Sequence, residues 1–478
     1  MTSTVGSVAW QGFKLAFGLI SLAGAWTSAV VKNGALWAKD SEEEKRELGA
    51  AQDRFWNLEQ EPLPGLRHAF FTTSNGTRLH YVVNEPAGSS APKDVAIFIH
   101  GFPDSFVLWR HFLQSSELQR NHILIAVDLP GYGGSDSLPA YGPNEVFETL
   151  CEFIIGVRQL FLQEGKKTVL VTHDWGAVIG ARLASEAHVL ADHWIITGGI
   201  IPSLQASNGK NRILLAKQML KTWIRSPLNI GLLKNGLSAL RPVVSQFRRS
   251  FYIFVFHLPW PFSNTFATFG NYWFLRVLHD MGKGPRTKTD KTFTALNPVD
   301  AGEAMAISTG PGLAQLEKGN VNGDRYGESV RRRTGDRGMS EKIRIYRENL
   351  VFGKWEKSLE TTAALFNISS NAVSGASSTS SGVLSNTAPK GALKAPATII
   401  LGERDPAFDR RLALDNARDY LVKGSQVVII KGAGHWLPLE QIGRRALEKT
   451  VLWALHDDVE NESIPFEAMS DVRVLEAL

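Results

Sequence analysis

Cysteine is nearly absent from this sequence. Its 478 residues include a single cysteine, Cys151, so an internal disulfide framework is excluded. Cys151 lies in a helical pattern of apolar residues, which indicates a place in the core. No group of cysteines and histidines has the spacing of a zinc site, and we therefore expect no bound metal.

The sequence also lacks a strong excess of charge. Lysine and arginine number 52 and aspartate and glutamate 47, which leaves a net charge of +5. So small an excess in a chain of this length gives no reason to expect nucleic acid as a partner. The glycine-rich run at 131–134 lacks the spacing of a nucleotide-binding loop, and we interpret it as a tight turn.

What the sequence does contain is a large apolar fraction arranged in short runs. Hydrophobic residues make up 44% of the chain, enough for one large core and an inserted or second domain. The runs that indicate buried strands are 95–99, 123–127, 169–172, 193–197, 397–401 and 427–430. Helical patterns separate them, and a hairpin is expected around Asn75-Gly76. This alternation predicts an α/β fold with a mostly parallel sheet and helices on both faces.

The alternation of strands and helices is interrupted between residues 201 and 397. Residues 202 to about 360 show helical patterns with many aromatic side chains. Polar or charged stretches that indicate surface loops lie at 282–286, 319–337 and 367–389. We therefore expect one α/β domain that carries a helical insertion. The predicted parts are an N-terminal segment at 1–60, the first part of the core at 61–201, an inserted lid at 202–394, and the second part of the core with a C-terminal tail at 395–478.

The N-terminal region contains a long uncharged run. Residues 15–31 carry no charge and are flanked by Lys14 and Lys32. Three interpretations fit this pattern: a membrane anchor, the apolar part of a cleaved signal peptide, or a helix that lies on a membrane or packs on the domain. We expect membrane association through residues 15–31, with the endoplasmic reticulum as one location. Without that association the protein would be cytoplasmic.

The stretch at 168–180 has the pattern of a strand, a sharp turn and a helix. β-branched and apolar residues lead into His173-Asp174-Trp175-Gly176, and a helical run follows. A turn this tight projects Asp174 out of the sheet, where the backbone N–H groups of the next helix point. A carboxylate placed there can attack a carbon atom. The structural alternative is that Asp174 only caps the helix.

Two further polar residues follow later strands. Asp405 comes after the run at 397–401, and His435 comes after the run at 427–430. The carboxyl ends of strands in an open α/β sheet share one crevice, so these residues are expected to meet Asp174 there. A nucleophile, then an acid, then a histidine is the chain order of α/β-hydrolases. Asp405 would orient one histidine nitrogen while the other deprotonates water.

These motifs together resemble the epoxide hydrolase family of the α/β-hydrolase superfamily. The matching stretches are His100-Gly101-Phe102-Pro103, the run from Asp128 to Ser135, His173-Asp174-Trp175-Gly176-Ala177 and Gly434-His435-Trp436. They cover the expected catalytic domain, at about 66–201 and 395–456. An aspartate at the apex separates this pattern from that of serine esterases.

The resemblance implies a role for two tyrosines of the insertion. Tyr252 and Tyr346 lie in segments similar to those that carry the epoxide-polarising tyrosines of the family. A phenol is protonated at neutral pH, so it can donate to an epoxide oxygen and stabilise the alkoxide that forms. The structural alternative is that both tyrosines only pack the helical insertion.

The implied reaction has two steps and needs no metal or organic cofactor. Asp174 attacks an epoxide carbon and forms an ester, and His435, oriented by Asp405, activates the water that releases a diol. The backbone N–H groups of Phe102 and Trp175 would hold the ester carbonyl oxygen, and these two residues are also expected to contact the substrate. The aromatic insertion favours a small lipophilic epoxide. The oligomeric state is left open.

The chain departs from the family pattern in two respects. Thr172 stands where relatives usually have a small residue, so crowding at the turn is expected. The insertion is longer than usual, with extra residues near 286–340 and 367–393.

Two other functions fit the same motifs. A haloalkane dehalogenase would use the same triad but needs donors for a halide, and Phe102 offers no side-chain donor. A relative that only binds a ligand would keep the fold without turnover.

Overall fold

The fold is built on one nine-stranded sheet. The computed structural model describes residues 4–85, 92–282, 296–375, 388–456, 465–466 and 469–478. The strand order is β1-β2-β4-β3-β5-β6-β7-β8-β9. The strands are β1 (Arg67–Thr72), β2 (Arg78–Val83), β3 (Val95–Ile99), β4 (Ile123–Val127), β5 (Thr168–His173), β6 (His193–Thr197), β7 (Ala397–Gly402), β8 (Gln426–Ile430) and β9 (Val472–Ala477). All pairings from β4 to β8 are parallel, whereas β1, β2 and β9 pair antiparallel at the two edges.

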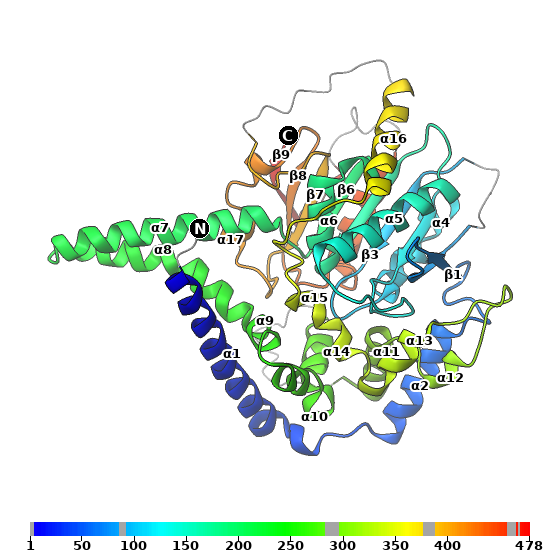
Figure 1. Cartoon of the computed structure of the whole chain (residues 1–478), viewed down its shortest axis with the longest axis horizontal. Coiled ribbons are helices and arrows are strands. Elements are labelled where there is room, and N and C mark those ends of the chain that lie inside the picture. Colours follow the sequence, from blue (N-terminus) through cyan, green and yellow to red (C-terminus); the bar gives the residue numbers. More distant parts are fainter. Residues whose placement is uncertain (1–3, 86–91, 283–295, 376–387, 457–464, 467–468) are drawn as a thin grey trace.

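The sheet separates two hydrophobic cores. In β3, Val95, Ile97 and Ile99 belong to one core and Ala96 and Phe98 to the other, because successive side chains of a strand point to opposite faces. The covering helices are α5 (Pro143–Phe161) and α6 (Trp175–Glu186) on one face and α18 (Gln441–Leu455) on the other. Burial on both faces explains why these strands are continuous apolar runs. The predicted α/β fold is confirmed, and each predicted apolar run is a strand (Figure 1).

The chain between β6 and β7 is helical in the described residues. The helices are α7 (Pro202–Arg225), α8 (Ile230–Arg249), α9 (Phe251–Phe256), α10 (Trp260–Met281), α11 (Pro298–Thr309), α12 (Leu313–Leu316), α13 (Glu328–Arg333), α14 (Met339–Lys342), α15 (Arg344–Arg347) and α16 (Leu359–Gly375). Helices α9, α10, α14 and α15 lie together at one end of the sheet (Figure 1). The pair α7 and α8 forms an antiparallel hairpin that projects away from the rest of the molecule.

The prediction of loops within the insertion was partly wrong. Residues 367–375, expected in a flexible loop, belong to α16, and residues 376–387 lie outside the described part of the chain. Glu148 of α5 accepts hydrogen bonds from the backbone N–H and the hydroxyl of Ser358 and from the hydroxyl of Thr361, at the start of α16. These long-range hydrogen bonds fix the first turn of α16. They outweigh the tendency of the serines and asparagines in this segment to form turns.

Two other local predictions also needed correction. The charged stretch at 319–337, expected as a loop, contains α13. The stretch at 282–286 lies almost wholly outside the described residues. The C-terminal residues, expected as a tail, form β9, which pairs with β8 and closes one edge of the sheet.

The N-terminal region forms two helices. They are α1 (Thr4–Asn33) and α2 (Glu42–Trp56). Judged by length and composition alone, the segment Val8–Asn33 is apolar enough to cross a membrane, and 17% of its most apolar window is buried. Leu22, Ala25 and Ala29 are buried, whereas Ile20 and Val31 face outward. The helix therefore packs on the protein by one face and exposes the other.

Candidate active site

Asp174 occupies the apex of the turn between β5 and α6. Its backbone has φ of 52° and ψ of −114°, a conformation that is costly for a residue with a side chain. A Cβ added to Gly101 would collide with the Asp174 carboxylate and lie 2.5 Å from the Trp175 amide nitrogen, so the close approach of these backbones requires glycine there. Asp174 holds the N-cap position of α6, yet its side chain makes no capping hydrogen bond. The carboxylate of Asp174 therefore does not cap α6.

One of the two expected backbone donors contacts this carboxylate. The N–H of Phe102 donates to Asp174 Oδ1 over 2.7 Å. The amide nitrogen of Trp175, the second expected donor, also lies close to Gly101. These N–H groups come from the ends of two neighbouring strands, β3 and β5. The Phe102 N–H therefore contacts the oxygen that would carry negative charge during attack on an aspartyl ester.

His435 lies between two carboxylates. Its Nδ1 lies 3.0 Å from Asp405 Oδ2, and its Nε2 lies 3.5 Å from Asp174 Oδ2. The other oxygen of Asp405 accepts the backbone N–H of Ala407 over 2.7 Å, which fixes the carboxylate. The structure therefore brings together the three residues that the sequence places after β5, β7 and β8.

The two carboxylates control the charge of His435. Burial alone would lower the pKa of the imidazole, but the charges of Asp405 and Asp174 and hydrogen bonds to both raise it well above its ordinary value. Burial by itself raises the pKa of Asp405, and the neighbouring imidazole outweighs burial and lowers it. With both carboxylates ionised, the resting site thus favours an imidazolium.

The rings of the two predicted tyrosines contact each other edge to face. Tyr252 belongs to α9 and Tyr346 to α15, and their ring centroids lie 5.8 Å apart at an interplanar angle of 81°. The ring of Tyr346 also packs on those of Phe102, at 5.3 Å, and Trp175, at 4.8 Å. Tyr346 thus contacts both residues whose backbones flank Asp174.

The environment keeps both phenols protonated. Burial is the largest cause that raises the pKa of Tyr252 and Tyr346, and the negative charge of Asp174 raises it further. The surrounding wall is aromatic and consists of Phe256, Phe266 and Phe274. Two protonated donors in an apolar wall can polarise a weakly basic oxygen.

Sequence reasoning missed two side chains that support the site. Asp104 is buried, accepts the indole N–H of Trp436 over 3.0 Å, and has a pKa raised to about 7 by burial. His173 is buried, and its Nε2 lies 2.9 Å from the carbonyl oxygen of His435. Both residues stand next to recognised motifs, but their partners lie far away in the chain, so no local signal identified these contacts.

The expected crowding at Thr172 is relieved by a glycine. The Thr172 hydroxyl donates to the carbonyl of Ile195 over 3.0 Å. A Cβ on Gly180 of α6 would lie 2.9 Å from Thr172 Cγ2. The helix therefore accommodates the β-branched side chain by lacking one of its own at that point.

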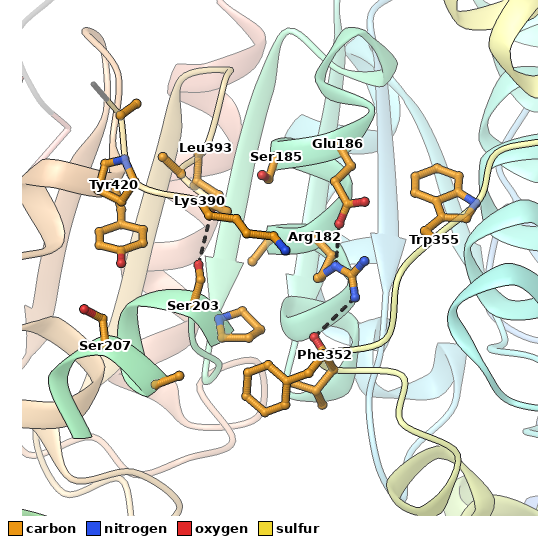
Figure 2. A pocket seen from close by; sticks show the side chains of 18 of the residues that line it. Arg182, Ser185, Glu186, Ser203, Ser207, Phe352, Trp355, Lys390, Leu393 and Tyr420 are labelled. Carbon is orange, nitrogen blue, oxygen red and sulfur yellow. Dashed lines mark hydrogen bonds and ion pairs between the residues drawn. The ribbon is translucent and has the colours of Figure 1, made fainter. Parts of the chain in front are cut away.

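A large cavity lies elsewhere, on the flank of α6 and α7. It has a volume of about 920 Å³, and its lining includes Arg182, Lys390 and Tyr420 but none of the predicted catalytic residues (Figure 2). Arg182 is already engaged, since it donates to Glu186 over 2.6 Å and to the carbonyl oxygen of Leu350 over 3.0 Å. Neither Asp174 nor His435 lines this cavity.

A family profile described as "Alpha/beta hydrolase family" matches residues 96–445, more than half of the chain. The chain belongs to this family. The match includes β3 to β8 and the three residues gathered at their ends. The α/β-hydrolase fold and the helical segment between β6 and β7 agree with this membership.

Relatives similar to this α/β-hydrolase include two epoxide hydrolases and a dehalogenase. Epoxide hydrolase 2 of Caenorhabditis elegans is 32% identical over 141 residues, 29% of this chain and 36% of the relative. Epoxide hydrolase 4 of Mus musculus is 35% identical over 111 residues, 23% of this chain and 28% of the relative. A haloalkane dehalogenase of Mycolicibacterium smegmatis is 35% identical over 108 residues, 22% of this chain and 32% of the relative. The matched part is about a third of each relative's length.

A solved structure, the Cif epoxide hydrolase from Acinetobacter nosocomialis, aligns with 88% of this chain and 99% of its own. Its TM-score is 0.49 and its sequence identity 14%.

Proposed function

We propose that this α/β-hydrolase opens a lipophilic epoxide to a diol through a covalent ester on Asp174. One observation carries the proposal: a carboxylate that makes no helix-capping bond lies 3.5 Å from His435 Nε2, and its charge reaches both Tyr252 and Tyr346, whose rings contact each other. The similarity to epoxide hydrolases supports it. Residues 202–394 would act as the lid that carries the phenols.

The first step forms the ester. Asp174 Oδ1 is held by the N–H of Phe102, so Oδ2 is the oxygen that attacks a ring carbon. The new carbon–oxygen bond forms as the ring bond to the epoxide oxygen breaks, and the electron pair moves to that oxygen. Tyr252 or Tyr346 donates its proton to the developing alkoxide, which leaves a hydroxyl group on the ester.

The second step consumes the ester and needs His435 as a base. Ester formation removes the negative charge of Asp174, so one cause of the raised pKa of His435 disappears and the imidazolium gives its proton to the phenolate that the first step leaves. The neutral imidazole can then accept a proton from water. The hydroxide attacks the ester carbonyl carbon, and negative charge develops on Oδ1 opposite the Phe102 N–H.

Collapse of this intermediate releases the product. The bond to the alcohol oxygen breaks, and that oxygen takes the proton from His435. The second proton of the water leaves the regenerated Asp174 carboxyl group and passes to His435, which restores the imidazolium. The sum is one epoxide and one water converted to one diol.

The decisive experiment follows the oxygen of water. In a single turnover of styrene oxide in ¹⁸O-water, we expect the label in the Asp174 carboxylate, because water attacks the ester carbonyl rather than the epoxide. In His435→Gln, we expect a protein whose mass is increased by the intact epoxide. Label that appears only in the diol would show direct attack by water and would exclude the ester.

The alternative is a haloalkane dehalogenase with the same triad, and the similarity to the Mycolicibacterium smegmatis enzyme favours testing it. Trp175 could donate to a halide, but the side chain of Phe102 cannot. A chloroalkane panel that yields chloride while epoxides remain intact would establish this activity. No product from either class would indicate a relative that only binds a ligand.

A further inference from the structure

The helical hairpin formed by α7 and α8 has an unusual combination of charge and apolar surface. From residue 202 to residue 250 the sequence contains nine lysines and arginines and no aspartate or glutamate. The hairpin also exposes eight large apolar side chains, namely Ile213, Leu214, Leu215, Ile224, Leu228, Ile230, Leu237 and Val244. Its tip is the most exposed part, with Leu228 at 96% and Ile224 at 70%. An ordinary solvated hairpin would present charges of both signs.

One face of α8 combines these two features. Leu237, Arg241, Val244 and Arg248 follow one another at helical spacing and lie on one side of the helix. A cavity of about 680 Å³ lies along this side and is lined by Leu237, Val244, Arg241, Arg248, Arg249 and Arg411. In the described part of the chain Arg241 and Arg248 form no ion pair, whereas Arg411 pairs with Asp409 over 3.1 Å. Arginines beside apolar side chains suit a phosphate joined to an acyl chain.

The hairpin is also continuous with the apolar N-terminal helix. Phe13 and Phe17 of α1 pack on Phe247 near the end of α8, with ring centroids 5.7 Å and 6.1 Å apart. The same two rings contact Phe254 of α9, the helix that carries Tyr252. The N-terminal half of α1 therefore packs on the end of α8 and on α9, and α1 begins close to the hairpin (Figure 1).

We propose that the α7–α8 hairpin is a membrane-docking element that binds the surface of an anionic phospholipid bilayer. The apolar tip would enter the headgroup region, and the lysines and arginines would contact lipid phosphates. Charge complementarity selects this partner, because a surface with nine basic and no acidic residues repels a second copy of itself. The proposal does not depend on the reaction at Asp174.

Vesicle flotation of the full chain tests the proposal. The vesicles are phosphatidylcholine alone, or phosphatidylcholine with about one third phosphatidylserine, at low and high salt. We expect phosphatidylserine to strengthen binding and salt to reverse the gain. In the variant Lys221→Glu/Arg225→Glu/Lys234→Glu, the partition coefficient onto phosphatidylserine vesicles should fall about a hundredfold, since each basic residue contributes about fivefold.

The matched control changes the same amount of charge elsewhere. The variant Lys354→Glu/Lys423→Glu/Lys449→Glu alters exposed lysines outside the hairpin and should bind like the original chain. All variants retain α1, so the comparison isolates the hairpin. Thermal melting checks that each variant is folded. Equal binding of the two triple variants would overturn the proposal.

A second pair of substitutions tests the apolar tip. Ile224→Ser/Leu228→Ser should weaken binding to both kinds of vesicle, because the tip supplies the apolar contact with the headgroup region. Sedimentation velocity of the same variant tests whether the hairpin binds a second copy of the chain instead of a membrane. A dimer that dissociates on this change, with vesicle binding unaltered, would assign the surface to a second copy of the chain and overturn the proposal.

Discussion

The two sides of the active site are held in place by different means. Asp174, Asp405 and His435 follow β5, β7 and β8, whose backbones are buried and hydrogen-bonded within one parallel sheet. Tyr252 and Tyr346 sit on helices of six and four residues, which are too short to be stable alone. The comparison teaches that the sheet positions the proposed nucleophile, acid and base, whereas side-chain packing positions the two tyrosines proposed to polarise the substrate.

The packing on the phenol side depends strongly on Arg347. This residue follows Tyr346, and its guanidinium donates to the carbonyl oxygens of Phe256 and Leu258 at the end of α9. It also donates to the hydroxyl of Ser263 over 3.1 Å. One side chain therefore ties the helix of one tyrosine to the helix of the other.

The largest effect is expected on the sheet side. Asp174→Asn should lower kcat by about 10⁴-fold or more, because the amide cannot form the ester. Its size is unchanged, so the melting temperature should stay close to that of the original chain. Diol formation measured by chromatography, together with melting curves, checks this. Substantial turnover in the variant would show that Asp174 is not the nucleophile.

Loss of one phenol should cost less than loss of the nucleophile. Tyr252→Phe and Tyr346→Phe should each lower kcat by about 10²-fold, with the double variant lower still, since each removes one donor to the alkoxide. Phenylalanine keeps the ring contacts, so both variants should fold like the original chain. Single-turnover kinetics should show slower ester formation. An unchanged rate in both variants would mean that the two tyrosines only pack the insertion and do not act on the substrate.

A smaller loss is expected when the link between the two helices is cut. Arg347→Met should lower kcat by about tenfold and leave hydrolysis of the ester unaffected, because it disturbs only the phenol side. Arg337→Met is a matched control, since Arg337 pairs with Asp40, which precedes α2, and not with the helix of either tyrosine. Equal effects of the two changes on the first step would argue against a positioning role for Arg347.

On the sheet side, a stability effect is expected where Thr172 meets α6. Gly180→Ala should destabilise the fold by about 1–3 kcal/mol, because the new Cβ crowds Thr172 Cγ2. Thr172→Ala in the same chain should restore much of the loss by removing the opposing methyl group. A double-mutant cycle from denaturant unfolding measures the coupling. Additive effects would show that the two positions do not crowd each other.

The last expected effect is a change in the pH dependence of stability. The folded pKa of His435 is raised, so its contribution is complete below the unfolded value of about 6.5 and is lost as the pH rises through the folded value. Asp174→Asn removes one negative charge and so lowers the folded pKa, which should make the loss smaller and complete at a lower pH. Melting temperatures from acidic to alkaline pH check this. Identical profiles would mean that Asp174 does not influence the imidazole.

The strands, the turn at Asp174 and the chain order of the triad could be predicted because they depend on local patterns. Apolar runs of about five residues indicate buried strands, and parallel strands bring their carboxyl ends to one edge. The support of His435 by His173 and of Trp436 by Asp104 could not be predicted, because each contact joins residues hundreds of positions apart. The same holds for α16, which starts where Ser358 meets Glu148.

The amino-acid sequence by itself determined that this is an α/β-hydrolase with an aspartate at the turn, since periodicity and short motifs act over a few residues. Tertiary structure decided which side chains flank that aspartate, how the two short tyrosine helices are joined, and that α7 and α8 project as a basic hairpin. Such arrangements depend on packing between distant segments, where burial and long-range hydrogen bonds outweigh local preference.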